Sequence, residues 1–246
     1  MHLKQTILTF NLKLSPKQVR QFRGAIAQKA GYEHDLFHNH NNKLITIEGG
    51  KLVHNGIEEQ LGTIPTKSKT TYFHRYPLIQ YQNNQGYAQL VGIGAGANAL
   101  NRWVQAFDGQ LVIGGKTIPL KITNYRCQVI ELGVHERYYY YRLSDWLPLR
   151  DSSFQQWQQT LRLTDKIRIL EKALANNIIG FAKGIGWQIP RKFEVFLTDY
   201  QRPRLVRYRN NKMLSFDVEW QANLRLPPAI SLGKGASEGK GLLEIN

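Results

Sequence analysis

The spacing of apolar side chains near the N-terminus predicts a strand followed by a helix. Residues 2–14 alternate between apolar and polar positions, which is typical of a strand with one buried face. Ser15 and Pro16 then suit a helix N-cap and a first helical position. Apolar residues recur at helical spacing up to residue 30, and Gly31 ends the helix.

The same pattern, read along the rest of the chain, predicts an α+β fold. Strands are expected over residues 44–48, 50–53, 73–82, 87–91, 110–113, 118–122, 127–132, 137–143, 193–200, 205–210 and 214–224. Helices are expected over residues 95–107 and 151–176, the latter with a break near 163–165. This order predicts two ferredoxin-like (βαββαβ, RRM-like) halves in tandem, residues 1–115 and 116–246.

Charge narrows the class of partner. The chain of 246 residues has 33 Lys and Arg against 18 Asp and Glu, a formal net charge of +15. Residues 1–30 and 200–212 contain no acidic residue, and residues 64–127 contain only Asp108. Such one-signed regions indicate a continuous positive surface for a polyanion, either a nucleic acid or an acidic membrane surface.

Several classes of protein are disfavoured by what the sequence lacks. The single cysteine, Cys127, excludes an internal disulfide framework and a cysteine-based zinc site. No apolar segment fits a signal peptide or a membrane span, so we expect a cytoplasmic protein without membrane contact. Residues 92–97 resemble a dinucleotide-binding turn, but the spacing G-x-G-x-G and the missing acid favour a close-packed strand–helix turn. We expect no cofactor and no metal.

A histidine-rich segment is the first candidate for chemistry. His34, His38 and His40 lie close together in a polar stretch that also contains Tyr32 and Lys43. Imidazole titrates near neutral pH, so it can accept the proton of an RNA 2′-hydroxyl or donate one to the 5′ leaving oxygen. A neighbouring lysine or tyrosine could stabilise the charge on phosphorus. A histidine metal site and a solvated loop are the alternatives.

A glycine-rich segment near the C-terminus is the second candidate. Glycines let backbone N–H groups approach a phosphate closely, and lysines add charge. The segment lacks the Walker A triplet, and a tight turn would explain one or two of its glycines but hardly four. The residues expected to contact a ligand here are Gly233, Lys234, Gly235, Gly239, Lys240 and Gly241.

Basic residues interleaved with aromatic ones form the third candidate. Such stretches suit phosphate contact and base stacking, although aromatic packing within a sheet is the alternative. Aiming the arginines of residues 202–209 at one ligand requires a bulge or turn near Pro203. The candidate RNA-binding residues outside the glycine-rich segment are Arg20, Arg23, Arg75, Tyr76, Arg191, Lys192, Arg202, Arg204, Arg207 and Arg209.

Together these motifs resemble the CRISPR-associated repeat-RNA endoribonucleases of the RAMP superfamily. The resemblance is carried by Leu36-Phe37-His38-Asn39-His40, Arg75-Tyr76-Pro77-Leu78-Ile79-Gln80-Tyr81, Gly184-Ile185-Gly186-Trp187, Leu226-Pro227 and the glycine-rich segment. It implies tandem ferredoxin-like halves and a metal-independent cut in each repeat, leaving a 5′-hydroxyl and a 2′,3′-cyclic phosphate. It places the catalytic histidine at His38 or His40, with Tyr32, His34 and Lys43 as helpers.

Two functional hypotheses follow from the resemblance. The first is an endoribonuclease that processes CRISPR repeat transcripts to crRNA. The second is a non-catalytic crRNA-binding subunit, which would not need the histidines. Both have RNA as partner and allow CRISPR effector subunits or a second copy of the chain as protein partners. A nucleotide- or metal-dependent enzyme has little support from the sequence.

Overall fold

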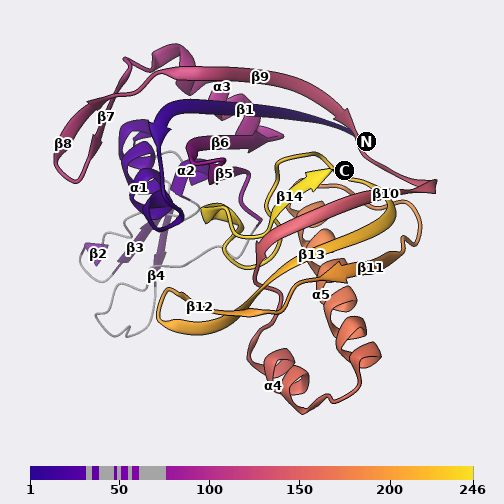
Figure 1. Cartoon of the computed structure of the whole chain (residues 1–246). Helices are drawn as coiled ribbons and strands as arrows, with labels where there is room; N and C mark the ends of the chain where they lie inside the picture. The colour runs from indigo at the N-terminus through magenta and orange to yellow at the C-terminus, as the bar shows by residue number, and fades with distance from the viewer. Residues whose placement is uncertain (32–34, 39–46, 49–50, 55–56, 61–75, 246) are drawn as a thin grey trace.

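The computed structural model describes residues 1–31, 35–38, 47–48, 51–54, 57–60 and 76–245. Within these ranges the chain forms two sheet-based halves that pack against each other (Figure 1). Two smaller sheets lie beside the first half; their strands are β2 (Ile47–Glu48), β3 (Lys51–His54) and β4 (Ile57–Gln60), and β7 (Gln110–Ile113) with β8 (Lys116–Pro119).

The first half is a ferredoxin-like βαββαβ unit. Its main sheet has the order β5-β6-β1-β9, all antiparallel, with β1 in the interior. Its elements are β1 (His2–Lys13), η1 (Pro16–Gln18), α1 (Val19–Ala30), α2 (Asp35–His38), β5 (Ile79–Asn84), β6 (Tyr87–Ile93), α3 (Ala95–Ala106) and β9 (Ile122–Glu131). The alternation that predicted β1 reflects two buried faces, because Leu8 and Phe10 face α1 and α3 while Leu3 and Ile7 face the second half.

The second half repeats this strand order with one helix missing. Its sheet has the order β11-β13-β10-β14, and β12 extends β13 as a hairpin. Its elements are β10 (Gly133–Trp146), α4 (Asp151–Gln159), α5 (Leu163–Gly184), β11 (Val195–Tyr200), β12 (Arg204–Tyr208), β13 (Asn211–Arg225), η2 (Ala236–Glu238) and β14 (Leu242–Ile245). The segment from Leu226 to Gly241, with the short η2, stands where the second helix of the unit would be. The tandem ferredoxin-like fold and the break between α4 and α5 are therefore confirmed.

One core is shared between the halves. Leu3, Val91 and Ile93 of the first sheet belong to the same buried cluster as Trp220 and Leu224 of β13. A second cluster, which includes Phe10, Phe22 and Trp103, lies between the first sheet and its two helices. Each ring in that trio approaches another edge-on, with centroids 5.9–6.4 Å apart.

Strand pairing places the junction of the halves later than residue 115. β9 pairs with β1 along its length, from His2↔Glu131 to Phe10↔Ile122, so it belongs to the first half. The division falls at Leu132, whose backbone N–H is bonded to the carbonyl of Met1. We expected strands over 118–122 and 127–132, but β8 ends at Pro119 and β9 is continuous from Ile122.

Candidate nucleic-acid interface

The glycine-rich segment folds as a tight loop against both halves. Four of its glycines have φ between +68° and +87°, a backbone conformation that residues with a side chain rarely adopt: Gly233, Gly235, Gly239 and Gly241. A Cβ on Gly241 would lie 2.1 Å from the carbonyl oxygen of Leu232. The argument that a turn explains only one or two of these glycines is therefore wrong, because all four are required by the backbone.

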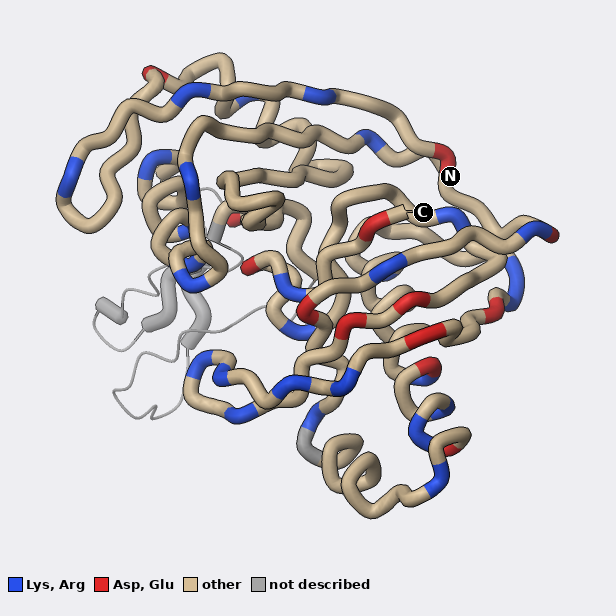
Figure 2. The backbone as a smooth tube through the Cα atoms, viewed as in Figure 1, with Lys and Arg blue, Asp and Glu red and all other residues tan. Residues whose placement is uncertain are grey.

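Glu238 joins three elements at the centre of this loop. Its carboxylate lies 3.2 Å from Nη1 of Arg23 on α1 and 3.7 Å from Nη2 of Arg209 at the tip of the β12–β13 hairpin. Its side chain is only 12% exposed, and Arg23 also lies near Ser237. The ion pairs hold α1, the loop and the hairpin together on one side of the molecule, where Lys and Arg gather (Figure 2).

Asp145 anchors the loop to the second sheet in the same way. Its carboxylate lies 3.1 Å from Nζ of Lys240 and 3.0 Å from Nη2 of Arg204, and it accepts a hydrogen bond from Ser215. Arg204 also pairs with Asp217 at 2.8 Å. Burial alone would raise the pKa of Asp145, but the charges of Lys240 and Arg204 outweigh it and the pKa falls below its usual value.

The tip of the hairpin is different, because its cations face each other. Arg207 pairs across the strands with Lys212, and both side chains are exposed. Like charges opposite one another destabilise a sheet, so this placement favours a polyanionic ligand. Arg209 occupies the turn with a φ of +54° and lies over the ring of Tyr208. Arg204 and Arg207 are three residues apart in β12, whose pairing with β13 is unbroken, so their side chains point to opposite faces and are not aimed together at one ligand.

The helix that carries His38 packs next to this surface. α2 lies against α1, and Phe37 is buried between α1 and α3 with its carbonyl bonded by the hydroxyl of Tyr81. This contact fixes the backbone of α2. The His38 side chain, Tyr32, His34, His40, Lys43 and Arg75 lie outside the described residues, so their roles stay predictions.

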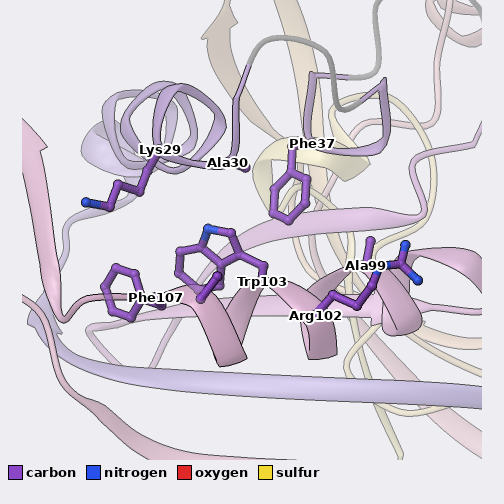
Figure 3. A pocket seen from close by; sticks show the side chains of 8 residues that line it. Lys29, Ala30, Phe37, Ala99, Arg102, Trp103 and Phe107 are labelled. Carbon is purple, nitrogen blue, oxygen red and sulfur yellow. The ribbon is translucent and has the colours of Figure 1, made fainter.

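An aromatic pocket of about 260 Å³ opens beside α2. The rings of Phe37, Trp103 and Phe107 line it, together with Lys29 and Arg102 (Figure 3). Lys29 is held 2.6 Å from Asp108, and this hydrogen bond lowers the pKa of that carboxyl. The pocket therefore has an apolar wall and charged ends beside α2.

Tyr76 has a structural partner. Its hydroxyl donates to the carbonyl of Ser231 at 2.7 Å and accepts from Gln80, and burial strongly raises its pKa. Its Cβ lies only 2.4 Å from where a Cβ on Gly184 would be. The motifs around Tyr76, Gly184, Leu226 and the glycine loop thus converge at the junction of the halves, and Tyr76 contacts RNA only if this packing opens.

The remaining predicted cations divide into two groups. Arg20 on α1, Arg202 just before β12 and Lys234 in the glycine loop are exposed and belong to or adjoin the elements of this surface. Arg191 and Lys192 are not brought to them, because they precede β11, which starts opposite Ala222 at the far end of β13 from the hairpin tip. Arg191 instead donates to the carbonyl of Val134.

The turn at residues 92–97 is a packing feature, as expected. A Cβ on Gly96 would lie 2.0 Å from the carbonyl oxygen of Leu78, and one on Gly92 would lie 2.7 Å from that of Gly96. The N–H of Gly94 is bonded to the carbonyl of Lys4. The glycines at positions 92 and 96 are therefore explained by the close packing of strand and helix.

Sequence reasoning missed the acids that organise the interface. Asp145, Asp217 and Glu238 hold four of the predicted RNA-binding cations, and Lys212 belongs to the hairpin tip but was not among the candidates. The one available signal was Glu238, an acid within an otherwise basic glycine loop. Asp145 gave none, because its partners lie 59 and 95 residues away.

Two kinds of feature are absent from the described ranges. None of their helices combines the length and apolar character needed to cross a membrane. None of their His, Cys, Asp and Glu side chains form a group of three placed to hold a metal ion.

Fold and surface together define a tandem ferredoxin-like protein with a glycine loop docked between its halves. The family models of the Cas6b N-terminal and C-terminal domains match residues 55–131 and 133–245. The chain therefore belongs to the Cas6b family. The boundary between these two matches falls at Leu132, where the strand pairing also divides the halves.

Similar proteins support this assignment. A crystal structure of Cas6b is 21% identical over the full length of both chains, with a TM-score of 0.79. A second, of the CRISPR RNA processing endoribonuclease Cas6b, is 18% identical over the full length of both, with a TM-score of 0.68. At these identities the likeness is one of fold. Uncharacterized protein MJ0978 of Methanocaldococcus jannaschii is 26% identical over 141 residues, which are 54% of this chain and 95% of that protein.

Proposed function

We propose that the chain is an endoribonuclease that cuts CRISPR repeat RNA to crRNA without a metal. The observation that carries this proposal is the basic surface built by α1, the glycine loop and the β12–β13 hairpin, beside the helix that carries His38. A solved Cas6b of the same fold is a CRISPR RNA processing endoribonuclease. The surface supplies affinity for a phosphate backbone, and the histidine segment supplies groups that transfer protons.

The proposed reaction is an internal transesterification. The 2′-oxygen of one nucleotide attacks the adjacent phosphorus, and the bond from phosphorus to the 5′-oxygen breaks. A base takes the 2′ proton, and an acid gives a proton to the leaving 5′-oxygen. The products are a 2′,3′-cyclic phosphate and a 5′-hydroxyl. His38 or His40 takes one of the proton-transfer roles, and Tyr32, His34 and Lys43 assist.

A decisive experiment is cleavage of repeat RNA in EDTA by wild type, His38→Ala and His40→Ala. Wild type cuts, and a substrate with 2′-H at the scissile nucleotide survives. Because general acid–base catalysis contributes about 10²–10⁴-fold, the variant lacking the catalytic histidine cuts at least ~100-fold more slowly while it binds RNA normally. His2→Ala, which removes an exposed histidine at the start of β1, is the matched control.

Two outcomes would contradict the proposal. Binding of repeat RNA by wild type without any cleavage would make the chain a non-catalytic crRNA-binding subunit, since its basic surface does not depend on the histidine segment. Loss of cleavage in EDTA, restored by a divalent ion, would exclude the metal-independent route.

Association with effector subunits, a homodimer and a cytoplasmic location also stay predictions.

A further inference from the structure

The two helices that follow β10, α4 and α5, line an open groove of about 1040 Å³. This groove is not part of the interface described above. Its cationic lining residues are Arg150, Arg162, Arg168 and Lys172. Among the described residues that line it, Asp165 is the sole acid, and it is ion-paired with Arg168 at 3.3 Å. The wall of the groove therefore carries a net positive charge, although it lies in the same half of the chain as the acids of the second sheet.

The arrangement of these groups favours an extended anion over a compact one. Arg168 and Lys172 are one helical turn apart on α5, and Arg162 precedes the same helix, so the positive charge forms a row. Amide side chains, including Gln156, Gln159 and Asn176, supply donors and acceptors along the same walls. The large ring nearby, Trp157, is buried and covered by Lys166, so the groove offers contact to phosphate and ribose rather than stacking of bases.

The groove adjoins elements that support the candidate RNA interface at both walls. On α5, Asn177 lines the groove and accepts a hydrogen bond from Trp146, and its Oδ1 lies 2.8 Å from where a Cβ on Gly233 would be. On the other wall, Pro148 follows Leu147, which packs against Tyr208 of the hairpin. The groove therefore lies next to the elements that position the glycine loop and the hairpin.

We propose that the α4–α5 groove binds a single-stranded RNA segment that flanks the repeat, through its sugar–phosphate backbone. This inference rests on the proposed function, because the repeat must first occupy the glycine loop. A groove that contacts only the sugar–phosphate backbone accepts flanking RNA of any sequence. An acidic polypeptide is the competing occupant.

The experiment compares binding of three uncleavable RNAs, each with 2′-H at the scissile nucleotide. One is the bare repeat, and the other two carry a short unstructured flank on the 5′ or the 3′ side. Each phosphate contact adds about −0.7 to the slope of log affinity against log salt for single strands, so two contacts change affinity roughly 7-fold between 50 and 200 mM salt. Wild type is expected to bind one flanked RNA about 5- to 10-fold more tightly than the bare repeat at the lower salt.

The variant Arg162→Gln/Lys172→Gln should lose this gain and bind the bare repeat as wild type does. The matched control, Lys116→Gln/Lys121→Gln, removes the same charge at the β7–β8 end of the molecule, far from α4 and α5, and should keep the gain (Figure 1). Neither variant changes a buried side chain, so folding is expected to be unaffected.

Three results would overturn the inference. The first is no gain in affinity of wild type from either flank, and the second is a gain that the groove variant keeps. The third is binding of a polyglutamate peptide to wild type but not to the groove variant while flanked RNA shows no gain, which would make the groove a protein-docking site. Failure of the proposed function is distinct, because it would appear as absent binding of the bare repeat in every variant, or as absent cleavage of an unmodified repeat in EDTA.

Discussion

Lys240 of the glycine loop and the cross-strand pair of Arg207 and Lys212 near the tip of the β12–β13 hairpin are all basic, yet their charges are used in opposite ways. In the loop, Lys240 is held by Asp145, and the neighbouring Arg23 is held by Glu238. At the hairpin tip, Arg207 and Lys212 lie opposite each other, and within the described part of the chain neither is held by an ion pair. The first arrangement fixes a backbone, and the second leaves charge available to a ligand.

This difference separates the basic residues by role. A cation that already pairs with a half-buried acid must give up that pair to reach a phosphate, so its contribution to affinity is small. An exposed cation facing another cation gains from a phosphate without such a loss. We therefore expect substitutions in the loop to change stability first and substitutions at the hairpin tip to change RNA affinity first.

The largest expected effect is that of Gly241→Ala. Its Cβ would collide with the carbonyl of Leu232 in addition to adopting a φ of +68°, so the free energy of unfolding should fall by about 3 kcal/mol. Gly186→Ala is the matched control, because Gly186 has a similar φ of +70° with nothing within 4 Å of its Cβ. Gly186→Ala should lower the free energy of unfolding by about 1 kcal/mol, which is the cost of backbone strain alone. Equal losses of unfolding free energy for the two variants in urea denaturation would show that the loop relaxes around the added Cβ and that the collision costs nothing.

A smaller loss of stability is expected for Asp145→Asn, about 1 kcal/mol at neutral pH, because the carboxylate is a third exposed and its pairs are screened by solvent. The loss should depend on pH. The pKa of Asp145 is lowered in the folded protein, so its contribution is complete above the ordinary value of about 3.9 and disappears as pH falls through the folded value. The difference in stability between wild type and variant should therefore stay constant from pH 7 to about pH 4 and narrow at lower pH, whereas a difference that stays constant below pH 4 would assign the effect to packing.

The smallest effect, and the sharpest test of the comparison, is Arg207→Gln. Repeat-RNA affinity should fall about threefold at low salt, equal to about 0.6 kcal/mol, with a reduced salt dependence and unchanged stability. Arg204→Gln, which breaks the pairs with Asp145 and Asp217, should instead lower stability with little change in affinity. Similar affinity losses for both variants would abolish the distinction between structural and ligand-binding cations.

Local patterns predicted the secondary structure well where one face is clearly buried. The strand at β1 and the helix at α1 followed from the spacing of residues such as Phe10 and Phe22, and both are confirmed. β9 was misread because it is an edge strand, and residues 123–127 are exposed on both faces. Without a buried face, the period-two signal disappears, and only the pairing with β1 reveals where the first half ends.

The basic and histidine-rich segments of the site could be predicted from the sequence, but the pairings between their residues could not. The basic loop, the basic hairpin and the histidine segment were each visible as stretches of sequence. Which cation meets which acid was not, because Arg23 and Glu238 are 215 residues apart. The glycines of the loop were visible too, but their requirement for positive φ depends on the packing of Leu232, Trp146 and Tyr81 around them.

The contact of Tyr76 and Gln80 with Ser231 has a consequence for how the chain folds. The N–H of Ser231 donates to Oε1 of Gln80 at 2.7 Å across 151 residues, and Gln82 adds a bond to the carbonyl of Ala229. Closing so long a loop lowers the conformational entropy of the chain, and only the completed contact offsets this loss. We therefore expect this step to occur late in folding. Once it has formed, neither half can open alone without exposing these buried amides, and a single cooperative unfolding transition is expected.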